Sequence, residues 1–558
     1  MGSQAGMADI LLLTWLLLVV LLILYRRALP KPIPGIPYNL EATKTILGDI
    51  PALTRHLSST KEVFPWMCFQ NIKLKSPIIQ LFIKPLSKPW VIITDYKEAQ
   101  DILTRRTKEF DRSPYFSDIF HGVMPNHHIT MSSTDERFPA NRKLIQGMMS
   151  PQFVNDILAP QVYSATEMLI EFWKVKSELA QGRPFDLRDD IIETLLDTIS
   201  VSTFGLSRSH GAISAQLAFL RGAPSLSETD PTTITPVEFP RTQRPPLIDA
   251  FITLTQSMVL PSMRRSKALK EAMISQQLTW ALRRFSGKGA EQTSTCVLDD
   301  IVRREIKLAE KEKRVPDCQS RTIFDELYGF VTGGVDTTGS TLMWAIKYLS
   351  ENQDAQSRLR MSLRDSFSTA SEKARKPTVR EITKARIPYL EAFLEETFRM
   401  AVTIPSHVRT ATEDVVVLGH VIPKGTDVFL SINGPGFTSP GFDIDEKKRS
   451  ESCASLRDGS EQWELKDMNL FRPERWLVTD QNGNESVNHS AAPQMLFSLG
   501  PRSCFGKRLG QLNMRVLLVL LVWHFEFLPL PGELISDDGI EKFTRQPRLT
   551  FVRLADAS

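Results

Sequence analysis

The sequence contains few cysteines and little net charge, and each shortage excludes a class of protein. Its 558 residues include five scattered cysteines: Cys68, Cys296, Cys318, Cys453 and Cys504. An odd, dispersed set is not a disulfide framework, and the absence of a CxxC pair or a His/Cys cluster argues against zinc. The 68 basic and 64 acidic residues leave a net charge of +4, too weak a field to indicate a nucleic-acid-binding protein.

Charge is missing altogether from one run near the N-terminus, which reads ILLLTWLLLVVLLILY over residues 10–25. A helix of that length spans about 24 Å, close to the roughly 27 Å hydrocarbon core of an endoplasmic reticulum membrane. We predict a transmembrane anchor at residues 10–25, with residues 1–9 in the lumen. A cleaved signal peptide is the alternative, but no positive residue precedes the run and no small-x-small cleavage site closes it.

Positive residues follow the apolar run at Arg26, Arg27 and Lys31. Because positive charge stays on the cytoplasmic side, we expect the rest of the chain to be cytosolic. Residues 26–38 are also rich in proline, which predicts a stiff, extended linker before a domain at residues 39–558. In the cytosol the cysteines stay reduced and the sequons beginning at Asn484 and Asn488 stay unglycosylated.

The domain at residues 39–558 reads as mainly α-helical with a small β portion. It contains no repeat and no shift of composition that would divide it, so we predict one large domain. Strand patterns occur at residues 77–95, 414–431 and beyond 526. Three stretches without periodicity predict a long loop, a proline-rich loop and a polar surface insertion, at 111–134, 222–246 and 446–466 respectively. The longest apolar helix is expected at 322–350.

One cysteine stands in an unusual context, Phe497-Ser-Leu-Gly-Pro-Arg-Ser-Cys-Phe-Gly506, directly before a predicted helix. The orphan N–H groups and positive dipole at a helix start lower the pKa of a thiol, so we expect a thiolate at Cys504. Gly500 and Gly506 let the backbone pass close to a flat, bulky ligand, on which Arg502 could hold a carboxylate. Phe497 could shield the sulfur from water. The alternative, a buried structural cysteine, is disfavoured by this context.

The second unusual feature is the pair Gly333-Gly334 in the interior of the long apolar helix, followed by Asp336 and Thr337. Each glycine costs a helix about 1 kcal/mol relative to alanine. The missing side chains and a loosened backbone would open a groove for oxygen and water, and the acid and hydroxyl beside it could relay protons. Close helix packing is the alternative, and the residues alone do not decide between the two.

Both motifs resemble signatures of the cytochrome P450 family. The family's haem-binding loop has the form FxxGxRxCxG and its oxygen-activation helix the form A/G-G-x-D/E-T-T, and every fixed position is present here. The resemblance implies the cytochrome P450 fold and a haem b whose iron is ligated by Cys504. It also implies a haem propionate paired with Arg502, and proton delivery by Asp336 and Thr337. An anionic sulfur ligand favours cleavage of an O–O bond.

The family's ExxR and PERW motifs match Glu396-Thr-Phe-Arg399 and Pro473-Glu-Arg475-Trp476. Residues three apart share a helix face, and the resemblance implies a buried network of Glu396, Arg399 and Arg475 behind the haem.

Two further arginines match propionate-binding positions of the family, Arg409 in PSHVRTATED and Arg142 in Phe138-Pro-Ala-Asn-Arg142. The second departs from the family's WxxxR pattern, because phenylalanine replaces the tryptophan and a proline follows it.

The resemblance implies a membrane-anchored monooxygenase of fungal type, which inserts one oxygen atom into a lipophilic small molecule and releases the other as water. The chain has no flavin or nicotinamide fingerprint, so its electrons must come from another protein. The resemblance implies a membrane-bound NADPH–cytochrome P450 reductase, with cytochrome b5 as a further donor. Lys507 and Arg508 beside the cysteine loop could face the acidic surface of such a partner.

Two other classes stay open at this point. One is a haem-thiolate isomerase or dehydratase that needs no reductase, and the other is a non-catalytic haem binder. The intact pair Asp336-Thr337 argues against the first and the oxygen groove against the second.

The residues do not specify the substrate. By analogy with the family, its pocket is lined by the 111–134 loop, the 222–250 region, Phe330, Thr403, Ile404 and the 535–546 hairpin. Their mixture of aromatic and aliphatic residues indicates an apolar ligand, and many fungal members oxidise terpenoids, polyketides or alkaloids in secondary metabolism.

Overall fold

The computed structural model describes residues 2–222, 235–256, 262–285, 294–456, 463 and 466–557. Two compact units divide the chain: unit 1 comprises Met1–Ser113 and Ser406–Arg457, and unit 2 comprises Pro114–Pro405 and Asp458–Ser558. Parts of two predicted segments lie outside the described residues, namely 223–234 of the proline-rich loop and most of 457–465 in the surface insertion.

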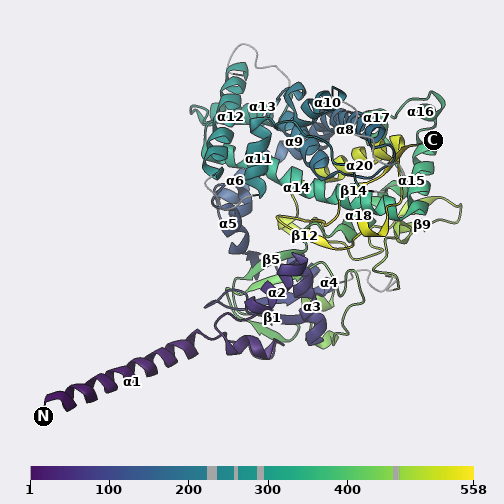
Figure 1. The fold of residues 1–558 in the computed structure, drawn as a ribbon. Helices are drawn as coiled ribbons and strands as arrows, with labels where there is room; N and C mark the ends of the chain where they lie inside the picture. The colour runs from purple at the N-terminus through teal and green to yellow at the C-terminus, as the bar shows by residue number, and fades with distance from the viewer. Residues whose placement is uncertain are drawn as a thin grey trace. The chain divides into compact units, whose positions relative to one another are not determined.

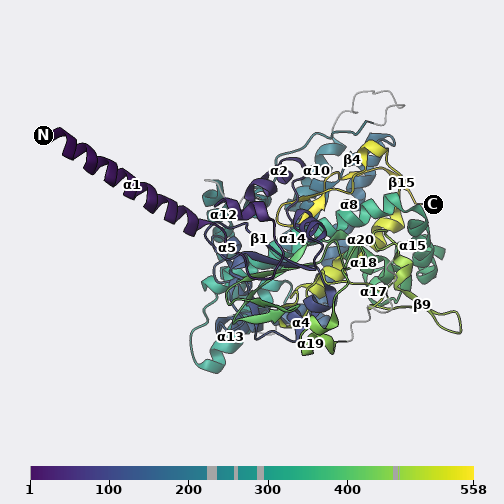
Figure 2. The ribbon, with the colours of Figure 1, turned by 90° about the horizontal axis from the view of Figure 1, so that it is seen from below.

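The chain begins with a helix, α1 (Gly2–Ala28), drawn at the N-terminal end in Figures 1 and 2. Its segment Asp9–Ala28 is long and apolar enough to cross a membrane, and its side chains are not buried against the protein. The helix ends on Arg26 and Arg27. Near that end the Tyr25 hydroxyl donates to the Lys44 carbonyl oxygen at 3.1 Å.

Unit 1 is built on a five-stranded sheet in the order β1-β2-β8-β5-β3. The strands are β1 (Ile78–Leu81), β2 (Trp90–Ile93), β8 (Asp427–Ser431), β5 (Ser406–Ala411) and β3 (Phe110–Arg112). Only β2 and β8 pair in parallel. The strands are rich in β-branched residues and almost wholly buried, as expected where sheet faces are covered. A small hairpin joins β6 (Val415–Val417) and β7 (His420–Ile422).

The helices of unit 1 are α2 (Ile50–Thr60), α3 (Phe64–Leu74), α4 (Tyr96–Thr104) and the short α19 (Glu451–Ala454). The N-terminus of α4 is capped by the Asp95 side chain, which accepts from the Glu98 backbone N–H. The helices α2 and α3 each have a proline in the first turn, where proline is favoured.

The prediction of one long loop at 111–134 is wrong in part. The segment contains the end of β3, the helix α5 (Pro114–Phe120) and a 3₁₀ turn, η2 (His128–Thr130). Long-range bonds order the turn: the backbone N–H of Asn126 donates to Asp325 and that of His128 donates to Glu326, each at 2.8 Å. Partners two hundred residues away leave no periodic signal in the local sequence.

Unit 2 holds most of the helices. They are α6 (Arg137–Ile145), α7 (Pro151–Phe153), α8 (Ala159–Ala180), α9 (Arg188–Phe204), α10 (Ala212–Arg221), α11 (Pro246–Gln256), α12 (Ser262–Phe285), α13 (Val297–Glu312), α14 (Arg321–Glu351), α15 (Gln353–Ser366), α16 (Ser368–Glu372), α17 (Val379–Lys384), α18 (Pro388–Ala401) and α20 (Lys507–His524). Its strands form antiparallel pairs: β4 (Phe185–Asp186) with β14 (Phe551–Val552), β9 (Leu477–Thr479) with β10 (Glu485–Val487), β11 (Phe525–Phe527) with β15 (Leu554–Asp556), and β12 (Gly539–Glu541) with β13 (Arg545–Pro547).

The long helix α14 is the axis of unit 2 and packs against α9, α18 and β13 (Figure 1). Two glycines allow α9 to approach closely, because a Cβ at Gly334 would lie 3.0 Å from Ile199 and one at Gly339 would lie 2.9 Å from Ile192. The core is formed by α9, α14 and α20, which are buried over most of their length. Glycines of α14 therefore lie where this helix packs closely against α9.

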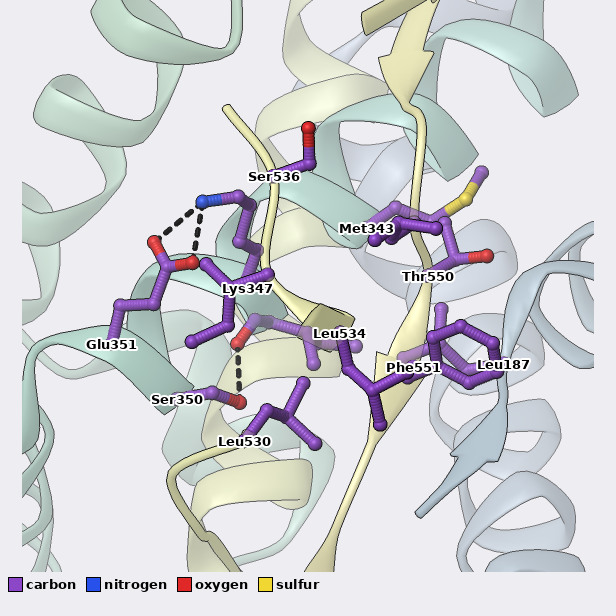
Figure 3. A pocket seen from close by; sticks show the side chains of 13 residues that line it. Leu187, Met343, Lys347, Ser350, Glu351, Leu530, Leu534, Ser536, Thr550 and Phe551 are labelled. Atoms are coloured by element: carbon purple, nitrogen blue, oxygen red, sulfur yellow. Dashed lines mark hydrogen bonds and ion pairs between the residues drawn. The ribbon is translucent and has the colours of Figure 1, made fainter. Parts of the chain in front are cut away.

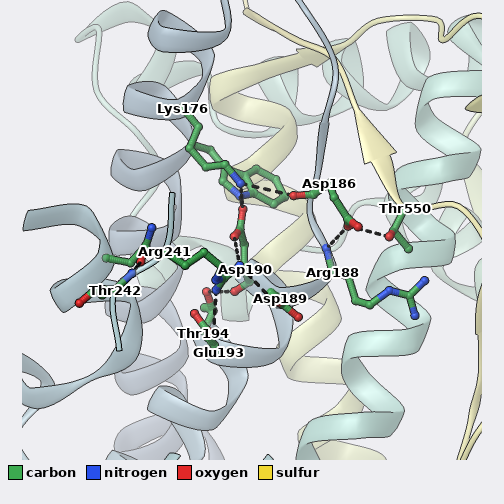
Figure 4. A network of polar contacts seen from close by, with 12 residues as sticks. Lys176, Asp186, Arg188, Asp189, Asp190, Glu193, Thr194, Arg241, Thr242 and Thr550 are labelled. Atoms are coloured by element: carbon green, nitrogen blue, oxygen red, sulfur yellow. Dashed lines mark hydrogen bonds and ion pairs between the residues drawn. The ribbon is translucent and has the colours of Figure 1, made fainter. Parts of the chain in front are cut away.

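An ion pair is enclosed between α8 and α9, as Figure 4 shows. The Lys176 ammonium lies 2.6 Å from the Asp190 carboxylate, and their side chains are 4% and 1% exposed. The Trp173 indole N–H also donates to Asp190 at 3.0 Å, and the ammonium lies 4.4 Å from the centre of the Phe185 ring. A buried charge is tolerated only when it is paired and hydrogen-bonded, and this one is.

Candidate functional site

The cysteine loop directly precedes α20. The Cys504 backbone N–H donates to the Phe497 carbonyl oxygen at 2.7 Å, which closes the loop on itself. Gly500 adopts a left-handed conformation, with φ of 69°, that a residue with a side chain reaches only with strain. The Phe497 ring packs edge-on against Phe398 of α18 with ring centres 5.2 Å apart. A rigid turn therefore presents the sulfur at the start of a helix.

The Cys504 side chain is accessible to solvent, yet protein atoms surround it closely enough that burial raises the pKa of the thiol. The Gly506 backbone N–H, which bonds the sulfur, and the Lys507 ammonium lower the pKa and offset only part of that effect. The ligand role expected of Cys504 stays a prediction. Burial disfavours the charged form of a thiol, whereas a bound metal cation favours it.

Two guanidinium groups gather beside this loop. Arg142 of α6 donates to the Pro501 carbonyl oxygen at 2.8 Å, and Arg502 donates to that of Met131 at 3.0 Å. Both lie against the Phe138 ring, Arg502 at 4.0 Å and Arg142 at 5.6 Å from its centre. Phe138 thus serves as a platform for two arginines, which a phenylalanine can do although it cannot donate a hydrogen bond.

The helix α14 runs through Gly333-Gly334 without a break. A Cβ at Gly333 would meet no atom within 4 Å, whereas Gly334 packs on α9, so the two glycines have different roles. The opening beside Gly333 comes from the missing side chain rather than from loosened backbone bonds. Thr337 lies one turn further, and its hydroxyl donates to the Gly333 carbonyl oxygen at 2.7 Å.

The Asp336 carboxylate bonds to the C-terminal hairpin of unit 2. It accepts from the Thr544 hydroxyl at 2.6 Å and from the Gln546 side-chain amide at 3.1 Å. Burial raises its pKa, and these two donors, together with the charge of Lys542, offset part of the rise. Asp336 and Thr337 are adjacent in sequence, but neighbours on a helix point about 100° apart, so the acid and the hydroxyl have different partners.

The structure brings Glu396, Arg399 and Arg475 together, with side chains 0%, 1% and 4% exposed. Arg399 donates two hydrogen bonds to the Glu396 carboxylate, at 2.7 and 2.8 Å, and Arg475 donates a third at 3.0 Å. Burial alone would raise the pKa of Glu396, but the two guanidinium groups outweigh it and the pKa lies below its ordinary value. The sequence analysis missed two more donors to this carboxylate, the Trp476 indole and the Arg472 backbone N–H.

Arg409 lies on β5 in unit 1, where it is 4% exposed and donates to the Val408 carbonyl oxygen at 2.9 Å.

A recess at the far end of α14 is separate from these residues (Figure 3). It is lined by Met343 and Lys347 of α14 and by Leu530, Leu534 and Phe551 of the C-terminal segment. Lys347 reaches over it to Glu351, whose carboxylate it contacts at 2.6 Å. Ile535 and Ser536, at the start of the 535–546 segment predicted to line the substrate pocket, also border this recess, whereas none of the predicted haem-binding or proton-relay residues does.

Comparison with known proteins identifies the family. The family model described as Cytochrome P450 matches residues 50–436 and 455–553. The chain belongs to the cytochrome P450 family. It is 36% identical to the cytochrome P450 monooxygenase GME11363 of Pestalotiopsis microspora, over 96% of each chain. It is also 36% identical to the cytochrome P450 monooxygenase TRI13 of Fusarium sporotrichioides, over 97% of this chain and 98% of that protein.

The fold agrees with this assignment. A solved structure, the heme domain of cytochrome P450DA, superposes with a TM-score of 0.66 over 95% of this chain and 99% of that one, at 16% identity. The predicted fold class, mainly helical with a small β portion, is confirmed, and so is the predicted monooxygenase class. Both the family model and these relatives span the two compact units.

Membership of the cytochrome P450 family implies a cysteine-ligated haem, and the residues present fit one. The Cys504 thiol is accessible to solvent, although the surrounding protein raises its pKa. A bound metal cation would deprotonate such a thiol outright. A Cβ at Gly506 would meet no atom within 4 Å, which leaves room beside the sulfur for a flat ring system. The guanidinium groups of Arg142 and Arg502 lie beside the loop, and guanidinium groups pair well with carboxylates such as those of a haem.

Two groups of site residues escaped the sequence analysis. One is Thr544 and Gln546, which bond Asp336 from about two hundred residues away. The other is a cluster in which His127 and His128 contact the buried Glu326, at 3.3 and 2.8 Å. A Cβ at Gly329 would lie 2.1 Å from the His127 ring, so the glycine allows this ring to pack against α14. No local spacing links these residues, so no sequence signal could have found them.

We predict that Glu396→Gln destabilises the protein strongly. The substitution keeps the side chain's shape but leaves two buried guanidinium groups facing a neutral amide, and breaking a buried ion pair costs about 3–5 kcal/mol. Unfolding of the holoenzyme in denaturant and haem content per protein measure the loss. Glu372→Gln, at an exposed position, is the control and should behave like the wild type.

The same substitution also has a pH signature. Because the folded pKa of Glu396 is depressed, its contribution to stability is present above the unfolded pKa and is lost as pH falls through the folded pKa. The Glu396→Gln variant should lack that part of the acid sensitivity. A variant as stable as the wild type at neutral pH would contradict the assigned role.

We predict that Cys504→Ser abolishes the red-shifted Soret band of the reduced CO complex, or the binding of haem itself. The substitution removes the only thiol in the loop that could become an anionic ligand. Cys318→Ser, which alters a buried cysteine, should keep the band. Retention of the band in Cys504→Ser would show that another cysteine ligates the iron.

Proposed function

We propose that this cytochrome P450 inserts one atom of O2 into a lipophilic small molecule of fungal secondary metabolism, while the other atom leaves as water. The observation that supports it most directly is the intact pair of sites in unit 2. A rigid cysteine loop stands at the start of α20, and α14 carries a glycine opening with a hydroxyl one turn away. The monooxygenase class follows from the relatives, whereas the substrate class rests on this proposal.

The cofactor in this proposal is haem b, whose iron the Cys504 sulfur would ligate. When bound, it supplies the redox-active iron at which O2 is activated. Arg142 and Arg502 would hold its propionates, and Arg409 of unit 1 is the third arginine assigned to them. Gly500 and Gly506 let the backbone approach its ring. Phe497 would keep water from the sulfur, a role supported by its packing against Phe398 beside the loop.

Proton delivery is assigned to Asp336 and Thr337. The Thr337 hydroxyl donates a hydrogen bond to the Gly333 carbonyl oxygen. The lone pairs of the hydroxyl oxygen can therefore accept a hydrogen bond from water. Such a water would be held beside the opening at Gly333. Asp336, whose pKa is raised by burial, is the acid assigned to replenish the proton.

Two other functions were considered for this haem site. A haem-thiolate isomerase or dehydratase would need no proton relay, and a haem sensor would need no substrate pocket. The acid and hydroxyl held on α14 favour oxygen activation over the first. The monooxygenase relatives along the whole chain favour it over both.

The partner assigned here is an NADPH–cytochrome P450 reductase of the same membrane, with cytochrome b5 as a second donor. Lys507 and Arg508 at the start of α20 are both exposed. They stand directly after the cysteine loop, where an acidic partner surface would bring its electrons close to the iron. No nucleic-acid partner is proposed.

The location assigned is the endoplasmic reticulum membrane, crossed once. In this arrangement residues 1–9 lie in the lumen, 10–25 in the bilayer, 26–38 form a linker and 39–558 are cytosolic. The apolar part of α1 and the arginines that close it support the orientation. The sequon at Asn484 is exposed, so glycosylation there would reveal the opposite orientation.

The substrate pocket is assigned to residues 111–134, 222–250, Phe330, Thr403, Ile404 and 535–546. Phe330 and Ile404 are partly exposed, as pocket residues should be. Thr403 is buried, and its hydroxyl bonds Thr341 of α14 at 2.9 Å, which points to a supporting role. The rings of Phe120 on α5 and Phe543 in the hairpin meet edge-on with centres 5.3 Å apart. An aromatic, mostly uncharged lining suits a lipophilic compound.

Turnover of a panel of lipophilic metabolites tests the proposed function. With a reductase and NADPH, we expect one compound class to gain the mass of one oxygen atom and to do so only when reductase is present, because the chain has no electron source of its own. Product mass spectrometry is the measurement. A product formed equally well without reductase would favour the isomerase or dehydratase instead.

We predict that Thr337→Ala uncouples the enzyme without unfolding it. Proton transfer by a positioned group is worth about 10²–10⁴-fold, so its loss should lower product per NADPH and raise release of hydrogen peroxide. Haem content should stay near normal, because alanine favours a helix. Thr332→Ala, on the same helix with a hydroxyl bonded to Tyr328, is the control. Unchanged product per NADPH in Thr337→Ala would remove Thr337 from the relay.

A further inference from the structure

The hairpin of β12 and β13 carries two donors on one face. Its turn is Lys542-Phe543-Thr544, closed by a backbone bond from Lys542 to Thr544 at 3.1 Å. Thr544 and Gln546 are two residues apart, so their side chains leave the strand on the same side, toward α14. Both are buried, at 1% and 4% exposure, and both donate to Asp336.

Thr544 is held between two residues of α14. Its hydroxyl has one proton, which goes to the Asp336 carboxylate at 2.6 Å. The Ser340 hydroxyl lies 2.6 Å from the Thr544 oxygen and must therefore be the donor in that contact. Asp336 and Ser340 are four residues apart on α14 and share a face. The three groups form a chain of hydrogen bonds that ends on the carboxylate.

Gln546 is oriented by a cation from a third element. Arg188 of α9 donates to the Gln546 side-chain carbonyl oxygen at 2.6 Å, and its other nitrogen reaches the Pro547 carbonyl oxygen at 2.9 Å. A guanidinium group only donates, so the Gln546 oxygen must face Arg188 and its NH2 group must face Asp336. The neutral side-chain amide of Gln546 therefore bridges the Arg188 guanidinium and the Asp336 carboxylate.

The other side of the strand fixes the hairpin against the same helix. The Arg545 guanidinium lies 4.5 Å from the centre of the Trp344 ring, and the Trp344 indole N–H donates to the Arg545 carbonyl oxygen at 3.3 Å. The Arg545 backbone N–H donates to Thr403 at 3.0 Å. The position of both donors is therefore set by tertiary contacts on both sides of β13.

Asp336 has no ion-pair partner among the residues that the structure describes, and Lys542 is the charged group that acts on it from the hairpin. A direct salt bridge, as at Glu396, would keep a carboxylate ionised. Neutral donors stabilise the ionised form more weakly than a salt bridge does, so they disfavour a proton on the carboxyl group less. This is what a relay acid needs, because it must give its proton to active-site water and regain one from solvent.

We propose that Thr544 and Gln546 are positioning residues for Asp336: through neutral hydrogen bonds, the C-terminal hairpin holds the relay acid of α14 in a state that both donates and regains a proton. The proposal rests on the proposed function of Asp336. It assigns a part in proton delivery to residues that lie outside the family's signature motifs. Phe543 is adjacent to Thr544 and packs on Phe120, and both phenylalanines belong to the assigned substrate pocket. In this proposal the donors to Asp336 therefore lie beside that pocket.

The test compares Thr544→Val, which keeps the shape and removes the hydroxyl, with Thr544→Ser, which restores it. Holoenzyme, reductase, NADPH and the best-oxidised compound of the metabolite panel are used. We expect Thr544→Val to lower product per NADPH roughly tenfold, since a hydrogen bond to a charged group is lost. Release of peroxide and the solvent deuterium isotope effect on product formation should rise. Thr544→Ser should be close to the wild type in all three.

Thr550→Val is the matched control. Thr550 is also buried on the C-terminal segment, and its hydroxyl also donates to a carboxylate, that of Asp186 at 2.7 Å (Figure 4). If loss of a buried threonine bond acts only through the fold, both valine variants should change coupling alike. That result would overturn the proposal. Gln546→Leu provides a second route to the same loss if Thr544→Val yields no holoenzyme.

A double-mutant cycle with Asp336→Asn separates this proposal from the proposed function. If Thr544 acts through Asp336, adding Thr544→Val to Asp336→Asn should cause no further loss of coupling. Additive losses would overturn the positioning role and leave Asp336 as the acid. Full coupling in Asp336→Asn alone would instead overturn the assignment of Asp336 and with it the reason for the hairpin's role.

Discussion

Burial of charge is the constraint on which the rest of this structure depends, and the sulfur of Cys504 shows it most clearly. The protein encloses the thiol and thereby raises its pKa, and the helix start and Lys507 do not compensate. A cytochrome P450 needs that sulfur as an anion. The iron of the haem is the cation that can make it one, so the cysteine loop is built to be completed by its cofactor.

Two carboxylates in unit 2, the buried Glu396 and the partly buried Asp336, meet the same constraint in opposite ways. Glu396 is surrounded by Arg399, Arg475 and two further donors, and its pKa is lowered despite burial. Such a group stays ionised and stabilises the fold. Asp336 is met by a hydroxyl and an amide, and its pKa stays raised. The first arrangement suits a structural brace and the second suits an acid that exchanges protons.

The glycines of α14 have two different roles: some allow close packing, and one leaves open space. Gly334 and Gly339 admit α9, Gly329 admits the His127 ring, and Gly333 alone faces open space. Close packing therefore holds for Gly334, and Gly333 leaves the space that the proposed oxygen groove needs. The hydroxyl of Thr337 then bonds back to Gly333 and stands beside the opening.

The sequence by itself determined the family, because the spacing within the cysteine loop, the α14 motif and ExxR is local and the chemistry of each needs those residue types. It also predicted the long helices, whose apolar periodicity is set by their own residues. It did not predict the turn at His128, because that turn depends on Asp325 and Glu326, about two hundred residues away. Only the tertiary structure decided where Asp336 points. A helix sets the direction of a side chain, but the donors that meet it come from a hairpin two hundred residues further along the chain, and no local pattern records that contact.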